Sequence, residues 1–325
     1  MYPGSVISSI VNSQFSIVNF YRSLTPEHWI CLAGLILLAY WLLRTSLGAK
    51  ALSGSTPRRN SMPIYLPLVP LLLWFGPVPM AALAARGLIG QFQPRTGNAG
   101  PDWQIAFLDN CVFIVGGIVI TAVILLLARA HFARRLKGFG LNIKTVPADF
   151  LCAFANLLAV WPLIVAAISV TTYLGQHIWG QDYQMQPHQE LQLFSEYSQL
   201  PLRITIVVVA VIVAPLLEEL LFRGLVQTMV RSLLETRTGT DVGTDGHGQV
   251  SVSPCSGRSK SAWVAIAAGS GLFTLMHANP GHWPALFILG ACMGYAYEKS
   301  GSLLRPIFVH AIFNGASIAA ALSQS

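Results

Sequence analysis

The sequence predicts an all-α membrane protein, a polytopic transmembrane bundle of about eight helices. Composition is the first reason: of 325 residues, 54% are hydrophobic and 10% are charged, and the mean hydropathy is +0.58. A soluble domain carries about 25% charged residues. Distribution is the second reason, because the apolar residues gather in runs of about 20, the length that crosses a bilayer as a helix.

Eight apolar runs are candidate spans. They are roughly 29–46, 63–86, 104–128, 149–174, 203–230, 261–278, 284–298 and 303–322. The second run holds several prolines between Pro63 and Pro79, so we expect it to be kinked or partly re-entrant. The seventh run is short, and we expect it to be tilted or not fully spanning. No internal repeat of helices is evident, which disfavours a transporter built from duplicated halves.

The charged residues predict the orientation of the bundle. The 44–61 and 129–148 connections are rich in lysine and arginine, whereas the 175–202 connection holds Asp182, Glu190 and Glu196. Basic connections stay on the cytoplasmic side, so we expect the acidic connection outside and, with eight spans, both termini outside. The net charge of +7 reflects this pattern and does not indicate nucleic-acid binding.

Two further stretches are polar. Within 231–260, the stretch from Thr236 to Gly257 is mostly glycine, serine, threonine and aspartate, which predicts a flexible cytoplasmic loop. The N-terminus lacks a basic start followed by an apolar core, so we expect no cleaved signal peptide. The five cysteines are scattered and show neither metal-ligand spacing nor the even number of a disulfide framework.

The fifth run contains charges that packing does not explain. Glu218, Glu219 and Arg223 lie within six residues of one another, and each charge near the centre of a span costs at least about 2.5–3.5 kcal/mol. Glu219 and Arg223 are four apart and can pair, whereas Glu218 points about 100° away from Glu219 around the helix. Pro215, one turn earlier, should free a backbone carbonyl and bend the helix.

Two later runs also carry polar groups. His277 lies near the end of the sixth run, where Asn279-Pro280-Gly281 closes the helix. His310 and Asn314 in the last run are four apart and share a helix face. Each group alone could be structural: Glu219–Arg223 as an ion pair, His277 as a helix-end histidine, and Asn314 as a bond between helices.

Taken together, these groups suit the hydrolysis of an acyl bond within the membrane. A glutamate with two histidines can bind a divalent metal, or the glutamate can activate a water directly as a general base. Neighbouring carboxylates in unlike surroundings can take two different roles. Asn314 offers an amide donor that could stabilise an oxyanion.

Glu-Glu-x-x-x-Arg at 218–223, Phe-x-x-x-His at 273–277 and His-x-x-x-Asn at 310–314 follow one another on successive apolar runs. This order resembles the CPBP family, the CAAX-prenyl-protease and bacteriocin-processing group of intramembrane proteases, also called Abi. The resemblance covers about 150–322. It implies a catalytic helix bundle over 149–325, preceded at 1–148 by transmembrane helices that match no motif.

The resemblance also implies roles. Glu218 would activate the water, with Glu219 and Arg223 in support, His277 and His310 would complete the site, and Asn314 would stabilise the oxyanion. It leaves open a zinc ion on Glu218, His277 and His310 or a metal-independent glutamate protease; no HExxH helix is present. The substrate would be a membrane-associated protein or peptide at the bilayer, cut by a multi-pass enzyme of a bacterial inner membrane.

Three other functions remain possible on the residues alone. A non-enzymatic immunity or scaffold protein could use the same fold, although it would not need two acids and two histidines together. A proton-coupled transporter could use Glu218 and His310 as a relay. A serine protease could use Ser270, but the first glycine of the GxSG pattern is Ala268 here, and small residues in a span usually indicate close packing.

Overall fold

The computed structural model describes residues 25–92, 103–186, 188–238 and 256–324, and these form helices and no β-strand. The first helices are α2 (Pro26–Arg44), α3 (Leu68–Phe75), α4 (Pro77–Phe92), α5 (Trp103–His131), α6 (Arg135–Phe139), α7 (Val146–Trp179) and α8 (Gln189–Glu196). The later ones are α9 (Leu200–Val208), α10 (Ala214–Glu219), α11 (Thr228–Thr238), α12 (Ser256–Leu275), α13 (Trp283–Ser300) and α14 (Leu304–Gln324).

Six stretches of the described residues are long and apolar enough to cross a membrane. They are Pro26–Arg44, Leu68–Leu88, Trp103–His131, Ile143–Trp179, Leu200–Thr236 and Leu304–Ser323. The other two expected spans, 261–278 and 284–298, form α12 and α13, which pack against each other. The prediction of an all-α polytopic bundle is confirmed, and the protein is an integral, multi-pass membrane protein.

The proline-rich second run is broken, as expected. α3 ends at Phe75 and α4 starts at Pro77, with Gly76 between them. A proline at the first helical position costs no hydrogen bond, because that N–H has no partner within its own helix. The prediction of a flexible loop over 231–260 is wrong at both ends, because 231–238 belong to α11 and 256–260 to α12. Two other predictions concern residues outside the described ranges: the absence of a signal peptide in 1–24, and a flexible loop at 239–255.

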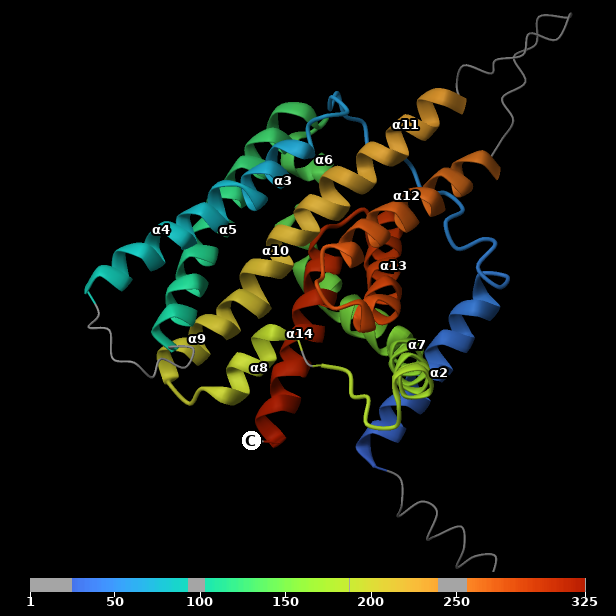
Figure 1. The fold of residues 1–325 in the computed structure, drawn as a ribbon. Helices are drawn as coiled ribbons and strands as arrows, with labels where there is room; N and C mark the ends of the chain where they lie inside the picture. The colour runs from blue at the N-terminus through green and yellow to red at the C-terminus, as the bar shows by residue number, and fades with distance from the viewer. Residues whose placement is uncertain (1–24, 93–102, 187, 239–255, 325) are drawn as a thin grey trace, which may run out of the picture.

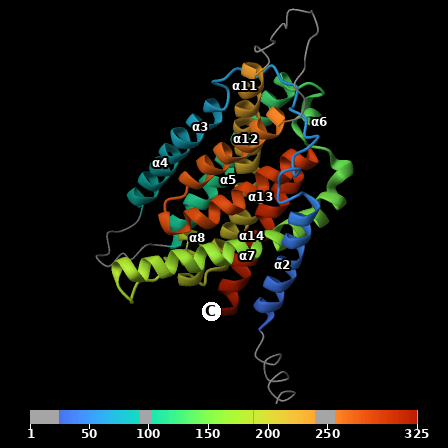
Figure 2. The same cartoon turned by 90° about the vertical axis from the view of Figure 1, so that its right-hand side faces the viewer.

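The helix that carries Glu218 runs through the middle of the bundle. α9, α10 and α11 continue one another, with α5 against one side and α12 against the other (Figures 1 and 2). Between them the backbone is π-helical at Val209–Val213 and again at Leu220–Gln227. Such wider turns are rare and occur frequently at functional sites.

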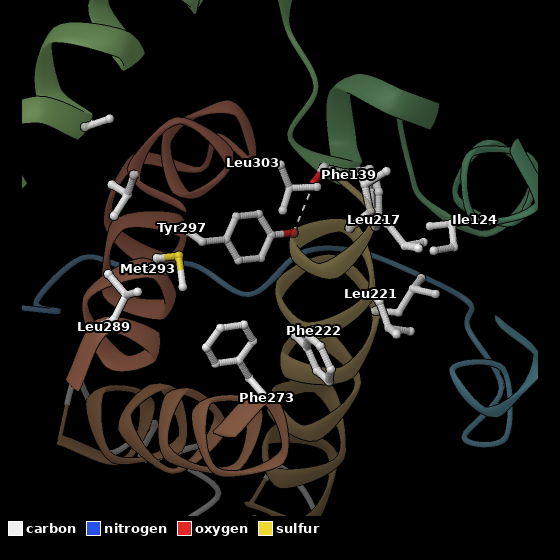
Figure 3. Packing of buried hydrophobic residues seen from close by; sticks show 14 of the residues in the cluster. Ile124, Phe139, Leu217, Leu221, Phe222, Phe273, Leu289, Met293, Tyr297 and Leu303 are labelled. Carbon is white, nitrogen blue, oxygen red and sulfur yellow. Dashed lines mark hydrogen bonds between the residues drawn. The ribbon is translucent and has the colours of Figure 1, made fainter. Parts of the chain in front are cut away.

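A packed apolar core holds this helix against α12 and α13. Phe222 meets Phe273 edge to face, with ring centroids 5.7 Å apart, and both side chains are buried. Beside them Tyr297 of α13 donates a hydrogen bond of 3.0 Å to the carbonyl of Phe139 (Figure 3). A buried tyrosine needs such a partner for its hydroxyl. The core therefore fixes the relative positions of the three motif segments.

Candidate active site

A cavity of about 620 Å³ lies beside the central helix. Four of the six residues singled out in the sequence line it: Glu218, His277, His310 and Asn314. The other two, Glu219 and Arg223, are completely buried behind its wall. The fold thus brings the three motif stretches to one place, although they are spread over about a hundred residues of sequence.

His310 lies between the two adjacent glutamates. Its Nδ1 is 3.0 Å from Glu219 Oε1, and its Nε2 is 4.0 Å from Glu218 Oε2. When Nδ1–H donates to Glu219, the neutral ring presents Nε2 as an acceptor towards Glu218. A gap of 4.0 Å is too long for a direct hydrogen bond and suits a bridging water.

Glu219 and Arg223 form the ion pair expected from their spacing. Arg223 Nη1 donates to Glu219 Oε1 over 3.0 Å, and Nη2 donates to the carbonyl of Gly290 on α13 over 3.0 Å. The guanidinium also lies 4.7 Å from the ring centroid of Phe273. Buried charges persist only with such partners. This pair therefore orients Glu219, which in turn orients His310.

Glu218 is in different surroundings. Its side chain is 17% exposed, against 0% for Glu219, and it lines the cavity. Its Oε2 accepts no hydrogen bond from a described residue. A carboxylate oxygen left without a donor is available to a water or to a substrate.

His277 lies in the connection just after α12. Its Nδ1 is 2.8 Å from the carbonyl of Phe273, which can only accept, so Nδ1 carries the proton and Nε2 is an acceptor. Burial lowers the pKa of this imidazole, and the hydrogen bond to Phe273 opposes that change. The ring of Phe273 lies edge to face with both His277 and His310, at centroid distances of 4.8 and 5.6 Å.

Asn314 completes the π-helical turn of the central helix. The N–H of Ala214 donates to the carbonyl of Val209, five residues back, so the next carbonyl, that of Ala210, faces Pro215. Proline has no N–H, and Asn314 Nδ2 donates to the Ala210 carbonyl instead, over 2.7 Å. The carbonyl that Pro215 was expected to free is thus satisfied from α14.

Several residues that line the cavity were not singled out in the sequence. Trp74 of α3 and Phe113 of α5 pack edge to face at 5.0 Å on the wall, and His188 of the acidic connection lies 6.1 Å from His277, ring centroid to centroid. His282 also lines the cavity, and its Nε2 is 2.9 Å from the carbonyl of Gln186. The sequence did not mark these residues as part of a site, since an aromatic residue in an apolar run or a histidine in a polar connection is common.

The described residues include no group of three His, Cys, Asp or Glu side chains arranged to hold a metal ion. Glu218 and His310 approach each other, but His277 does not join them as a third ligand in this arrangement. The donor types would suit zinc, yet their positions do not form a zinc set.

Residues 200–316 match the family model described as Rce1-like, type II CAAX prenyl endopeptidase Rce1-like. The match begins at α9 and ends within α14, so it contains all three motif stretches and none of α2 to α8. Comparisons with curated proteins and with solved structures found no match. Residues 200–316 are thus similar to intramembrane CAAX-type endopeptidases, which supports the CPBP resemblance of the three motifs.

Proposed function

We propose that the protein hydrolyses a peptide bond of a membrane-associated protein or peptide, with Glu218 as the general base. The observation that carries the proposal is the position of Glu218: its side chain lines the cavity, its Oε2 accepts no hydrogen bond from a described residue, and that oxygen lies 4.0 Å from His310 Nε2. A water between these two acceptors can donate one hydrogen to each.

The reaction then proceeds in two steps. Glu218 takes a proton from the water as its oxygen attacks the carbonyl carbon of the substrate, which gives a tetrahedral intermediate with a negative oxygen. Asn314 stabilises that oxygen with the second hydrogen of its amide, since the first is held by Ala210. The C–N bond breaks as Glu218 returns the proton to the leaving nitrogen. Glu219 and Arg223 keep His310 oriented throughout.

The family match supports a peptidase over the two non-catalytic alternatives. Glu218 acts as the base directly in this proposal, since no three His, Cys, Asp or Glu side chains of the described residues are arranged to hold a metal ion. Should a chelator abolish cleavage and zinc restore it, Glu218, His277 and His310 would instead be ligands.

Replacing Glu218 with Gln tests the proposal, because glutamine keeps the shape but cannot accept the proton. We expect Glu218→Gln to lower cleavage by about 10²–10⁴-fold, the usual contribution of a general base, and His277→Ala and His310→Ala to abolish it while expression is kept. The assay follows a peptide mixture by mass spectrometry with purified protein in proteoliposomes.

Glu196→Gln is the matched control, since it makes the same change at an exposed position of α8. It should cleave like the wild type. Normal cleavage by Glu218→Gln would refute the proposal, and uptake driven by a pH gradient in the same proteoliposomes would favour a transporter.

A further inference from the structure

The basic connections of the chain gather at one end of the bundle. Ala133 N donates to the carbonyl of Arg59, and Ser61 N donates to that of His131, so 44–61 and 129–148 lie side by side. Arg58 reaches the carbonyl of Gly138 over 3.1 Å. The connection between α13 and α14 lies between Lys299 and Arg305. It contacts the 129–148 connection, because Leu303 N donates a hydrogen bond to the carbonyl of Gly140.

The first turn of α11 meets the same cluster. Arg231 donates to the carbonyl of Ser55 over 3.0 Å and forms an ion pair with Glu298. Every described connection in which lysine and arginine dominate is therefore at one end, which we call the basic end. The residues that define it are Arg44, Lys50, Arg58, Arg59, Arg129, Arg134, Arg135, Lys137, Lys144, Lys299 and Arg305.

The opposite end is built from the acidic connection and the turn after α12. The carbonyl of Gln186 accepts from Asn279 Nδ2 over 3.1 Å and lies 2.9 Å from His282 Nε2. α8 then packs through Phe194 against Leu202 and Ile318, close to where α9 begins and α14 ends. The acidic connection is thus held over the end of the bundle that lies away from the basic residues.

The cavity belongs to this second end. Its lining reaches from Glu218 and Leu221 in the middle of the central helix to residues of the opposite-end connections, namely His188, Glu190, Leu191, Asn279 and His282. None of its lining residues comes from 44–61, 129–148 or 299–303. The cavity beside Glu218 is therefore bordered by the acidic connection and by no residue of the basic connections.

We infer that the cavity opens on the non-cytoplasmic face of the membrane, and that its substrate is a polypeptide segment presented on that face, such as an exported or membrane-inserted chain. The reason is the charge asymmetry: basic connections stay in the cytoplasm, and the basic residues all lie at the end away from the cavity mouth. That the cavity binds a substrate rests on the proposed function. The side of the membrane on which the cavity opens is inferred from charge and geometry alone.

Thiol labelling of the full-length protein in bacterial spheroplasts tests the orientation. Asp182→Cys and Gln184→Cys place thiols at exposed positions of the acidic connection, and Lys50→Cys and Ser53→Cys place them at exposed positions of the basic end. A membrane-impermeant sulfonated maleimide should label the first pair in intact spheroplasts. It should label the second pair only after the membrane is dissolved, with the unsubstituted protein giving the background from native cysteines.

Labelling of Lys50→Cys and Ser53→Cys in intact spheroplasts, alone or together with the other pair, would overturn the inference. Two variants at each end guard against a substitution that disturbs folding. Labelling needs no catalysis, so Glu218→Gln should give the same pattern, and its loss of cleavage is judged separately.

A vesicle assay tests access by substrate. A charged, membrane-impermeant peptide mixture should be cleaved by right-side-out vesicles and spared by sealed inside-out vesicles. The reverse result would place the cavity mouth in the cytoplasm and overturn the inference, although the proposed function would stand. Cleavage equal to that of Glu218→Gln in both kinds of vesicle would refute the proposed function while the labelling result remained valid.

Discussion

Glu218 and Glu219 are adjacent and chemically identical, yet the fold gives them different surroundings. Glu219 is fully buried, and its Oε1 is held by Arg223 and His310. Glu218 lines the cavity, its side chain is 17% exposed, and its Oε2 lies 4.0 Å from His310 Nε2. Because surroundings decide what a carboxylate can do, the first serves to orient other groups and the second is available for proton transfer.

The same substitution at both positions should therefore have different effects. Glu219→Gln leaves the buried guanidinium of Arg223 without its counter-charge, and breaking a buried pair in this way costs about 3–5 kcal/mol. We expect a clear fall in the thermal unfolding temperature together with the loss of cleavage. Glu218→Gln should lose cleavage with its unfolding temperature kept; equal unfolding temperatures for the two variants would contradict this assignment.

Asn314 has a structural role in the bond to the Ala210 carbonyl and a proposed catalytic role. A double-mutant cycle separates these two roles. Asn314→Ala leaves the Ala210 carbonyl without its donor, at a cost of about 1–3 kcal/mol. Pro215→Ala supplies a backbone N–H near that carbonyl, so Asn314→Ala should cost less stability in the Pro215→Ala background. Cleavage should stay low in both backgrounds; its recovery in the double variant would show that Asn314 acts only on the helix.

At the scale of elements, the positions of the helices follow from apolar run length, but their local geometry does not. The run at 203–230 predicted one span, and a continuous helix is found there. Its two π-helical segments had no signal beyond Pro215, because one extra residue per turn hardly changes an already apolar pattern. The pairing of Glu219 with Arg223 was predictable from spacing, whereas the contact of Glu219 with His310 depends on how α14 packs.

The helices outside the family match contribute a wall of the cavity, and this predicts a role for them. Trp74 and Phe113 are large aromatics on that wall. Trp74→Ala should lower kcat/KM by about 10–200-fold for substrates with a large apolar side chain near the cut, the range that pocket contacts supply. Substrates with small side chains should be affected far less, as measured by competition between paired peptides.

Leu72→Ala is the control for this prediction. Leu72 is on the same helix but is 70% exposed and does not line the cavity. It should cleave both kinds of peptide like the wild type. The same profile for Trp74→Ala and Leu72→Ala would mean that α3 does not select the substrate.

At the scale of the whole molecule, the two halves of the chain are joined by close helix packing that no motif reveals. A Cβ on Gly34 of α2 would lie 2.3 Å from the carbonyl oxygen of Leu158 on α7. Small residues let helices approach closely in a membrane. The assignment of 1–148 and 149–325 to separate parts stays a prediction, but α2 packs directly on the second part.

Gly34→Leu should force α2 away from α7. Overpacking of this kind costs about 1–3 kcal/mol, which a lower unfolding temperature in detergent would reveal. Gly87→Leu in α4 is the control, since a Cβ there meets no atom within 4 Å. Equal unfolding temperatures for the two variants would contradict tight packing of α2 against α7.

The contribution of the first half to the site could not be predicted from the sequence. Glu218, His277 and His310 stood out because polar groups are costly in a span, and the fold places them on or beside one cavity. Trp74, Phe113 and His188 reach the same cavity through contacts between distant segments. An apolar run predicts that a helix crosses the membrane, but it does not predict which other helices that helix packs against.

The π-helical segment at Val209–Val213 has a consequence for how this protein can vary over evolution. A helix turns by about 100° per residue, so deleting one residue from the α-helical stretch Leu200–Val208 would rotate the residues before it relative to Glu218. A deletion within Val209–Val213 would instead be absorbed, because a π-helical turn holds one residue more than an α-helical turn. Many residues of Leu200–Val208 could exchange one apolar side chain for another. Natural selection would then conserve the length of this segment more strictly than the identity of its residues.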